Sequence, residues 1–192
     1  MSQKSISKLE LNNSFVLVID YQSKLFPLIF NNEEVLDKAE TLLEFANLVK
    51  LPVVLTEHYP KGLGSTVEEL KNILEAGDNY RPLEKSSFDC FRDEKIASNL
   101  ASSKRKNVLV CGIETHICVL QTLLSALKRD FNVFLLVDAV GSRDQLDHHF
   151  ALMQAENAGA VLTTVETVMY QMVKGADFPK FKDFIKLVTS RE

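Results

Sequence analysis

A cysteine at the start of an amphipathic segment is the residue of this chain best placed for nucleophilic chemistry. The segment Cys111 to Val119 reads CGIETHICV and joins a continuously apolar run to a stretch with helical spacing. If Thr115 caps that helix, Cys118 falls in its first turn, where backbone N–H groups and the helix dipole lower the pKa of a thiol. A thiolate at such a junction is a good nucleophile. A lone cysteine is also often a small buried apolar side chain, so position alone leaves both interpretations open.

Two charged residues can give this thiol a route for its proton. Asp20 directly follows the apolar run Phe15 to Ile19, and Lys85 precedes a short stretch that resembles a strand. Taken singly, the aspartate could be a turn residue and the lysine a surface ammonium. Taken together, the carboxylate can accept the thiol proton and return it to a leaving amine, while the ammonium keeps the carboxylate ionised. Together the three residues form a workable set for chemistry with a cysteine nucleophile.

The elements that must position these residues alternate between strands and helices. We expect strands at Phe15–Ile19, Pro52–Thr56, Val108–Cys111, Val133–Val137 and Val161–Val165, with a weaker one within Glu84–Phe91. Helices are expected at Glu33–Lys50, Thr66–Glu75 and Glu94–Ser102. Another is expected along the apolar stripe Ile117, Leu120, Leu124 and Leu127. A further helix should begin at Ser142 and Gln145, which have capping-box spacing, and run towards Asn157, and two shorter ones should follow near the C-terminus. The stretch Tyr59–Ser65 is expected to be a loop.

This order predicts an α/β fold, namely a three-layer sandwich with a central parallel sheet of about six strands on the doubly wound, Rossmann-like plan. Ligands in such sheets bind beyond the carboxyl ends of the strands. Polar residues at four predicted strand ends should therefore converge on one crevice: Asp20, Glu57 with His58, Gly112 to Thr115, and Asp138.

Length and composition set limits on the class of protein. The 192 residues predict one domain, 1–192, and the formal net charge of −4 argues against a nucleic-acid partner. The basic cluster Lys104 to Lys106 is interpreted as a solvated loop. No apolar run approaches the ~20 residues of a membrane span, and the polar N-terminus has no secretion signal. Three cysteines do not make a disulfide framework, so we expect reduced thiols, a cytoplasmic location and no membrane association.

Five motifs together resemble the isochorismatase-like (cysteine hydrolase) superfamily, and most of all its isochorismatase domain-containing proteins. They are LVIDYQ (17–22), VVLTEHYPKGLGST (53–66), EKSSFDCF (84–91), CGIETHICVLQT (111–122) and VDAVGSR (137–143). The resemblance implies an Asp–Lys–Cys triad at Asp20, Lys85 and Cys118. It also implies a cis peptide bond between Ile113 and Glu114, and an oxyanion hole formed by the backbone N–H groups of Glu114 and Cys118. Members are commonly homo-oligomers, and the apolar C-terminal segment Phe178 to Val188 could pack on its own sheet or on a neighbour.

The chain departs from the metal-binding nicotinamidases of that superfamily. They carry an Asp-x-His pair after the second strand and a further histidine before the lysine, whereas this chain has Thr56-Glu57-His58 and no histidine between His58 and Lys85. We therefore expect no metal and no cofactor. His116 neighbours the nucleophile without belonging to the implied triad, and His148 and His149 are expected to be solvated. Possible substrate-pocket residues are Gln22, Phe26, His58 and Thr115.

The function predicted from the sequence is hydrolysis of an amide or carbamoyl-type C–N bond of a small molecule through a thioester on Cys118. Hydrolysis of a vinyl ether, as in isochorismate, needs no cysteine nucleophile and is disfavoured. The alternative is a non-hydrolytic scaffold or a thiol-based redox protein that keeps the same fold.

Overall fold

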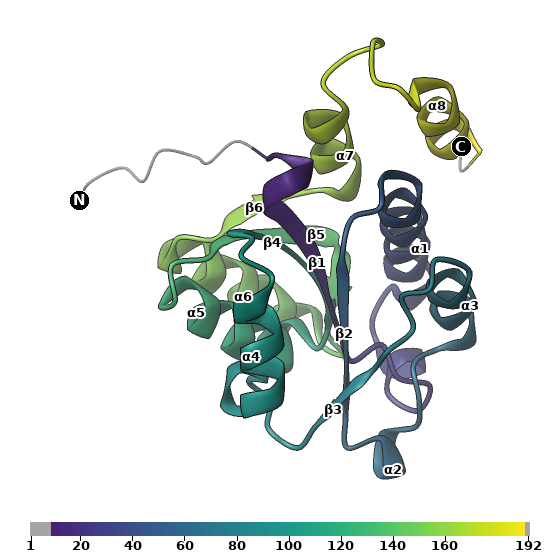
Figure 1. Cartoon of the computed structure of the whole chain (residues 1–192). Coiled ribbons are helices and arrows are strands. Elements are labelled where there is room, and N and C mark those ends of the chain that lie inside the picture. Colours follow the sequence, from purple (N-terminus) through teal and green to yellow (C-terminus); the bar gives the residue numbers. More distant parts are fainter. Residues whose placement is uncertain (1–8, 191–192) are drawn as a thin grey trace.

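The computed structural model describes residues 9–190 and contains an open sheet of six parallel strands in the order β3-β2-β1-β4-β5-β6 (Figure 1). The strands are β1 (Ser14–Ile19), β2 (Val53–His58), β3 (Leu83–Lys85), β4 (Asn107–Ile113), β5 (Asn132–Gly141) and β6 (Val161–Thr163). The predicted three-layer α/β fold is confirmed. The polar N-terminal stretch, predicted not to be a secretion signal, lies largely outside the described residues.

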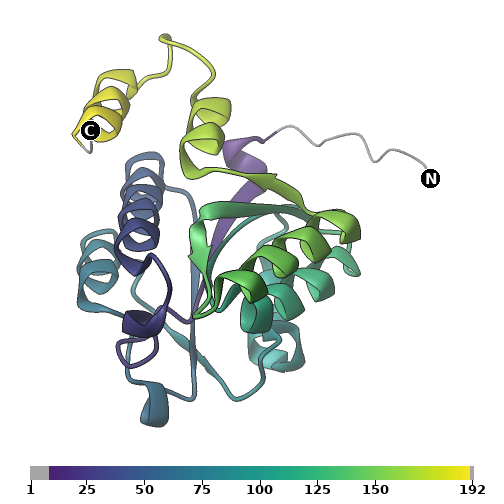
Figure 2. The same cartoon turned by 180° about the vertical axis from the view of Figure 1, so that it is seen from behind.

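Helices cover both faces of the sheet. On one face lie α1 (Asn32–Val49), α3 (Glu68–Ala76), α7 (Val165–Val173) and α8 (Phe181–Thr189), and on the other α4 (Glu94–Ser102), α5 (Leu120–Leu127) and α6 (Gln145–Ala158) (Figures 1 and 2). The central strand β1 shows the consequence. Val16 and Val18 pack in one core, while Phe15, Leu17 and Ile19 pack in the other, so all five are buried and the sequence is continuously apolar.

Several predicted boundaries change for identifiable reasons. Asp144, not the predicted Ser142, caps α6, because its carboxylate accepts hydrogen bonds from Leu146 N and Asp147 N. The expected loop after β2 contains the short helix α2 (Pro60–Leu63). β6 ends at Thr163 because Thr164 caps α7.

The longest strand, β5, runs four residues beyond its predicted end. Val110 pairs with Leu135 but Gly112 pairs with Val140, so β5 accommodates extra residues in an irregular stretch around Asp138. The polar Asp138 interrupts the apolar run, so the continuous apolar residues indicate only the first half of the strand.

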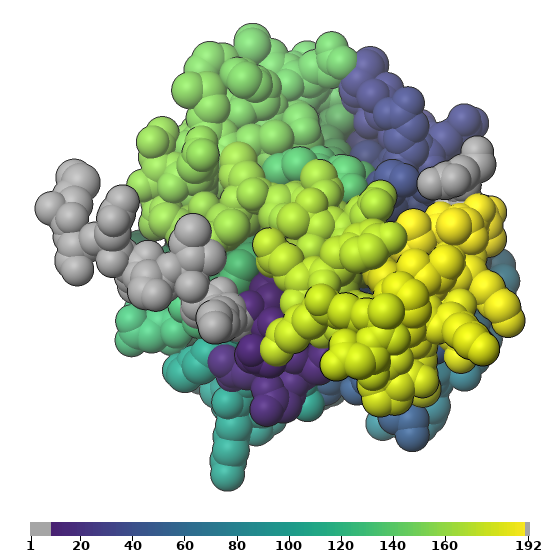
Figure 3. Space-filling model, turned by 90° about the horizontal axis from the view of Figure 1, so that it is seen from above, coloured from purple at the N-terminus to yellow at the C-terminus, as the bar shows by residue number. Residues whose placement is uncertain are grey.

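The C-terminal helices close the end of the sheet where β1 begins. Residues of α7 and of the segment after it, yellow-green in Figure 3, lie beside the purple residues at the start of β1, and Lys174 forms an ion pair with Glu10 there at 2.7 Å. Phe184 of α8 is fully buried and contacts Phe45 of α1 edge to face. The C-terminal segment therefore packs on its own chain. No helix in the described part of the chain is long and apolar enough to cross a membrane.

Candidate active site

A fully buried ion pair joins the ends of two strands in this chain. Asp20 follows β1 in a left-handed backbone conformation, with φ of 57°, and Lys85 is the last residue of β3. The side chains are 1% and 0% exposed, and Lys85 Nζ lies 2.5 Å from Asp20 Oδ2. Thr56 Oγ1 donates to the other carboxylate oxygen at 2.8 Å, and Lys85 Nζ also donates to the Ser87 carbonyl at 3.2 Å. Both oxygens of Asp20 are thus held.

The charges of this pair stabilise each other. Burial is the largest single influence on Lys85 and lowers its pKa, but the charge and hydrogen bond of Asp20, together with the charges of Cys118 and Cys90, outweigh burial and the pKa is raised. Lys85 is therefore an ammonium at neutral pH, and its charge faces the Asp20 carboxylate. A buried pair of this kind contributes a fixed local field more than net stability.

Cys118 lies on a π-helical turn, Thr115–Val119, that leads into α5. Its side chain is buried, with 6% exposure. Burial raises the pKa of this thiol, and the negative charge of Asp20, including a hydrogen bond between the two side chains, raises it further, while Lys85 acts in the opposite direction. The prediction of a lowered thiol pKa is therefore wrong, because it considered only the helix dipole and left out burial and the charge of the nearby carboxylate. The resting group is a neutral thiol beside a carboxylate.

The backbone before Cys118 is held from two sides. The peptide bond between Ile113 and Glu114 is cis, at the place the resemblance implied. The Glu114 carbonyl accepts from Ile117 N at 3.0 Å and Val119 N at 3.2 Å. Its buried carboxylate accepts from the backbone N–H and Nε of Arg143. The turn that would carry the oxyanion hole is anchored at both its backbone and its side chain.

Histidines near this turn have partners that the sequence did not reveal. Thr115 does not cap the helix as predicted, since its hydroxyl is 3.0 Å from His148 Nδ1. His148 was expected to be solvated, but it is half-buried, and burial lowers its pKa. His116 Nδ1 lies 2.9 Å from Ser142 Oγ. These contacts join the nucleophile turn to β5 and α6.

Of the other predicted pocket residues, Gln22 and Phe26 are buried and hold neighbouring parts of the chain, whereas His58 lies beside an exposed ring. Gln22 is buried, and its side-chain amide bonds the backbone of His58 and Gly64, so it fixes the chain after β2. Phe26 is buried against Tyr21, with ring centroids 5.4 Å apart. His58 lies 5.2 Å from the ring of Phe88, which is 48% exposed and which the sequence reasoning missed. Burial and the charge of Lys85 lower the pKa of His58, so its ring is neutral.

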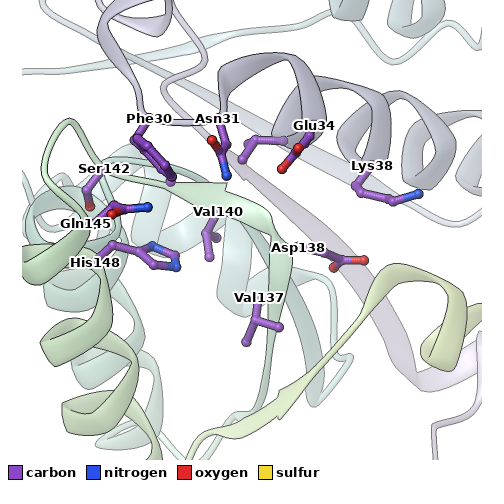
Figure 4. Close-up of a pocket in the computed structure, with 12 residues that line it drawn as sticks. Phe30, Asn31, Glu34, Lys38, Val137, Asp138, Val140, Ser142, Gln145 and His148 are labelled. Carbon is purple, nitrogen blue, oxygen red and sulfur yellow. The ribbon is translucent and has the colours of Figure 1, made fainter.

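Asp138 does not join the crevice, contrary to prediction. Because β5 continues past it, its carboxylate instead accepts from Val165 N at the start of α7. It lines a cavity of about 480 Å³ between α1, β5 and α6, whose lining also includes Lys38, Ser142 and His148, the last with its ring towards the centre of Figure 4. The Asp20–Lys85–Cys118 cluster is not part of this cavity's lining.

Comparison with known proteins identifies the family. The Isochorismatase domain model matches residues 14–167. The chain is 35% identical over 190 residues to isochorismatase family protein 1A of Dictyostelium discoideum, covering 98% of this chain and 92% of that protein. It is 36% identical over 183 residues to isochorismatase domain-containing protein 2 of Danio rerio, covering 95% and 90%. The chain belongs to the isochorismatase family.

A solved structure supports this assignment. The structure titled MAR1 ribonuclease from Caenorhabditis elegans has 39% identity and a TM-score of 0.89, covering 95% of this chain and 93% of that one. Isochorismatase-like proteins are typically hydrolases, and the matched span contains Asp20, Lys85 and Cys118.

The nicotinamidase-type metal site of this superfamily does not fit the residues present. The carboxylate of Glu57, the residue before His58, accepts from the N–H and hydroxyl of Thr66. His58 Nδ1 is buried without a hydrogen-bond partner, so this nitrogen is left as one candidate metal ligand. In the part of the chain that the structure describes, no three His, Cys, Asp or Glu side chains gather as metal ligands would.

Proposed function

We propose that this isochorismatase-family protein is a cysteine hydrolase that cleaves an amide or carbamoyl-type C–N bond of a small molecule through a thioester on Cys118. The observation that carries the proposal is the buried, ion-paired Asp20 carboxylate, whose charge acts on the nearby Cys118 thiol. A neutral thiol hydrogen-bonded to a carboxylate is a nucleophile together with its base.

The reaction divides into two steps that return every group to its starting state. As Cys118 sulfur attacks the carbonyl carbon, Asp20 takes the thiol proton, and it then gives that proton to the departing nitrogen. A thioester and a free amine result. Water next attacks the thioester, Asp20 takes a proton from the water, and the proton returns to the Cys118 sulfur as the acid leaves. Lys85 keeps the carboxylate in place and ionised between steps.

Charge that develops on the substrate oxygen needs fixed donors. We assign this role to the backbone N–H groups of Glu114 and Cys118, on the turn that Arg143 anchors. One donor of this kind contributes about a hundredfold or more in rate. Beyond the reacting bond, the neutral His58 ring and the exposed Phe88 ring form a wall suited to a flat, uncharged group.

A screen of small amides and carbamoyl compounds tests the proposal. Wild-type protein should release amine from at least one compound, Cys118→Ala should release none, and the buried Cys90→Ala should retain activity as the matched thiol control. Mass spectrometry of the quenched wild-type reaction should find the acyl group on the peptide that carries Cys118. Turnover retained by Cys118→Ala would refute the mechanism, and no hydrolysis across the screen would favour the scaffold or redox alternative.

We also propose a small molecule, not RNA, as substrate, although the Caenorhabditis elegans neighbour is titled a ribonuclease. A carboxylate-activated thiol suits attack on an acyl carbon, and the chain has a formal net charge of −4. Incubation with single-stranded RNA, with Cys118→Ala alongside, checks this directly. RNA cleavage by the wild type that Cys118→Ala loses would overturn it.

Finally, we propose that the protein acts as a homo-oligomer in the cytoplasm. Three large apolar side chains spaced along the outer face of α6 support self-association, since Leu146 is 64%, Phe150 51% and Met153 44% exposed. The cysteines form no disulfide, as a reducing compartment requires. Light scattering should give a multimer that Phe150→Ser disrupts.

A further inference from the structure

A second cavity, of about 440 Å³, lies on the α4 side of the sheet and carries concentrated positive charge. Its lining includes the three successive basic residues Lys104, Arg105 and Lys106, a fourth cation at Arg129, the rings of Phe91 and Phe131, and small residues of α4. Lys106 directly precedes β4, and Arg129 follows α5. Two segments distant in sequence thus bring four cations to one recess.

No acidic residue lines this cavity. None of the ion pairs among residues 9–190 involves any of the four cations. Lys106 Nζ lies 5.6 Å from the centre of the Phe131 ring, and the Arg129 guanidinium lies 4.7 Å from that of Phe91. Ring contacts of this kind hold a cation in place but do not neutralise it.

Helix ends explain only part of this charge. α4 ends at Ser102 and α5 at Leu127, next to the basic residues, and a helix C-terminus attracts cations. Each end is equivalent to about half a negative charge, so the two together offset about one of the four positive charges. About three positive charges remain for a bound anion to balance. Arg105 has a structural role, since its Nη1 donates to the carbonyls of Leu11 and Ser14.

We propose that this cavity binds a phosphate-bearing small anion, an inorganic or organic diphosphate. Such a ligand carries two or three negative charges in a compact group, which matches the excess and suits lysine and arginine donors. The site is separate from the proposed reaction. It lies where β4 begins, whereas the Cys118 turn follows the other end of that seven-residue strand, about 20 Å away.

The test compares two pairs of substitutions that change the net charge equally. Lys104→Gln with Lys106→Gln removes two exposed cations of the cavity, and Lys95→Gln with Lys128→Gln removes two exposed cations that do not line it. Calorimetric titration at low ionic strength uses pyrophosphate as the inorganic source and ADP as the organic one. Thermal melting checks that each variant is folded.

We expect wild-type protein to bind at least one of these two probes, more weakly as sodium chloride is added. The cavity pair should weaken binding at least tenfold, and the control pair less than twofold. Tighter binding of ADP than of pyrophosphate would assign an organic diphosphate, and the reverse an inorganic one. Three results would overturn the proposal: no binding of either probe, equal weakening by both pairs, or binding of an RNA oligonucleotide alone.

Discussion

Replacing Asp20 by asparagine should make Cys118 more reactive towards an alkylating reagent while it abolishes hydrolysis. Burial is the main cause of the raised pKa of this thiol, and the Asp20 carboxylate adds to it. Asparagine keeps the shape of the side chain but removes both the charge and the base. The thiol then ionises more readily, yet nothing remains to carry its proton to a leaving group.

The size of the effect follows from the contact between the two side chains. Two negative charges separated by about 4 Å, at an effective dielectric constant of about 20, repel each other by about 4 kcal/mol, and we take this as the size of the Asp20 effect on the thiolate. Its removal therefore raises the thiolate population about a thousandfold. Each thiolate also becomes less nucleophilic as its basicity falls, which offsets about twentyfold of that gain. The expected net increase in alkylation rate is about fiftyfold.

The assay is iodoacetamide labelling near neutral pH, followed at each cysteine by peptide mass spectrometry. Cys90 and Cys111 are internal controls, since burial raises the pKa of the first to about 11 and of the second to about 12. Lys85→Met should slow the labelling of Cys118, because Lys85 favours the thiolate. If Asp20→Asn labels no faster than wild type, or if both variants shift the rate in the same direction, the electrostatic account of Cys118 is wrong.

Three further predictions concern the effect of buried ionisable side chains on stability. Asp20→Asn and Lys85→Met should each cost about 3–5 kcal/mol of unfolding free energy, and the double variant less than their sum, because it leaves no charge unpaired; urea denaturation measures this. Burial raises the pKa of Cys111 to about 12 in the folded protein, compared with about 8.5 in the unfolded chain. The contribution of this buried thiol to the free energy of unfolding is therefore complete below pH ~8.5, and between that pH and the folded pKa it falls by about 1.4 kcal/mol per pH unit. Cys111→Ala should flatten this decrease of the unfolding free energy with pH. Arg143→Ala should cost about 1–3 kcal/mol, because the buried Glu114 carboxylate loses its guanidinium partner and keeps only the backbone N–H of residue 143, and Glu114→Gln added to it should recover part of the melting temperature.

Most of the sheet could be predicted because its strands are buried on both faces. Phe15 to Ile19 and Val108 to Cys111 are continuously apolar, and the structure gives each a strand that contains the predicted run. Helix α4 has the bounds predicted from its sequence, and in the structure the Asp93 side chain caps its first turn. β3 was placed only loosely, because a three-residue edge strand has too few residues to show a period.

The site was less predictable because its contacts cross the chain. Asp20 and Lys85 are 65 positions apart, so spacing could not show that they form a 2.5 Å pair. The family motifs singled out both residues, although they carry no information on burial. The π-helical turn of Cys118 and the bond from Thr115 to His148 have no local sequence signal either. The apolar periodicity in this region indicates only the helix that follows, α5.

A neutral resting thiol is consistent with catalysis once the charge of the whole site is considered. Cys118 as a thiol, with ionised Asp20 and Lys85, gives a buried cluster of zero net charge. Losing the proton to solvent leaves that cluster with one uncompensated negative charge, and this cost raises the thiol pKa. Passing the proton to Asp20 instead keeps the net charge at zero. The same carboxylate therefore opposes spontaneous ionisation of Cys118 and permits ionisation coupled to attack, so alkylation and hydrolysis should respond in opposite directions when it is removed.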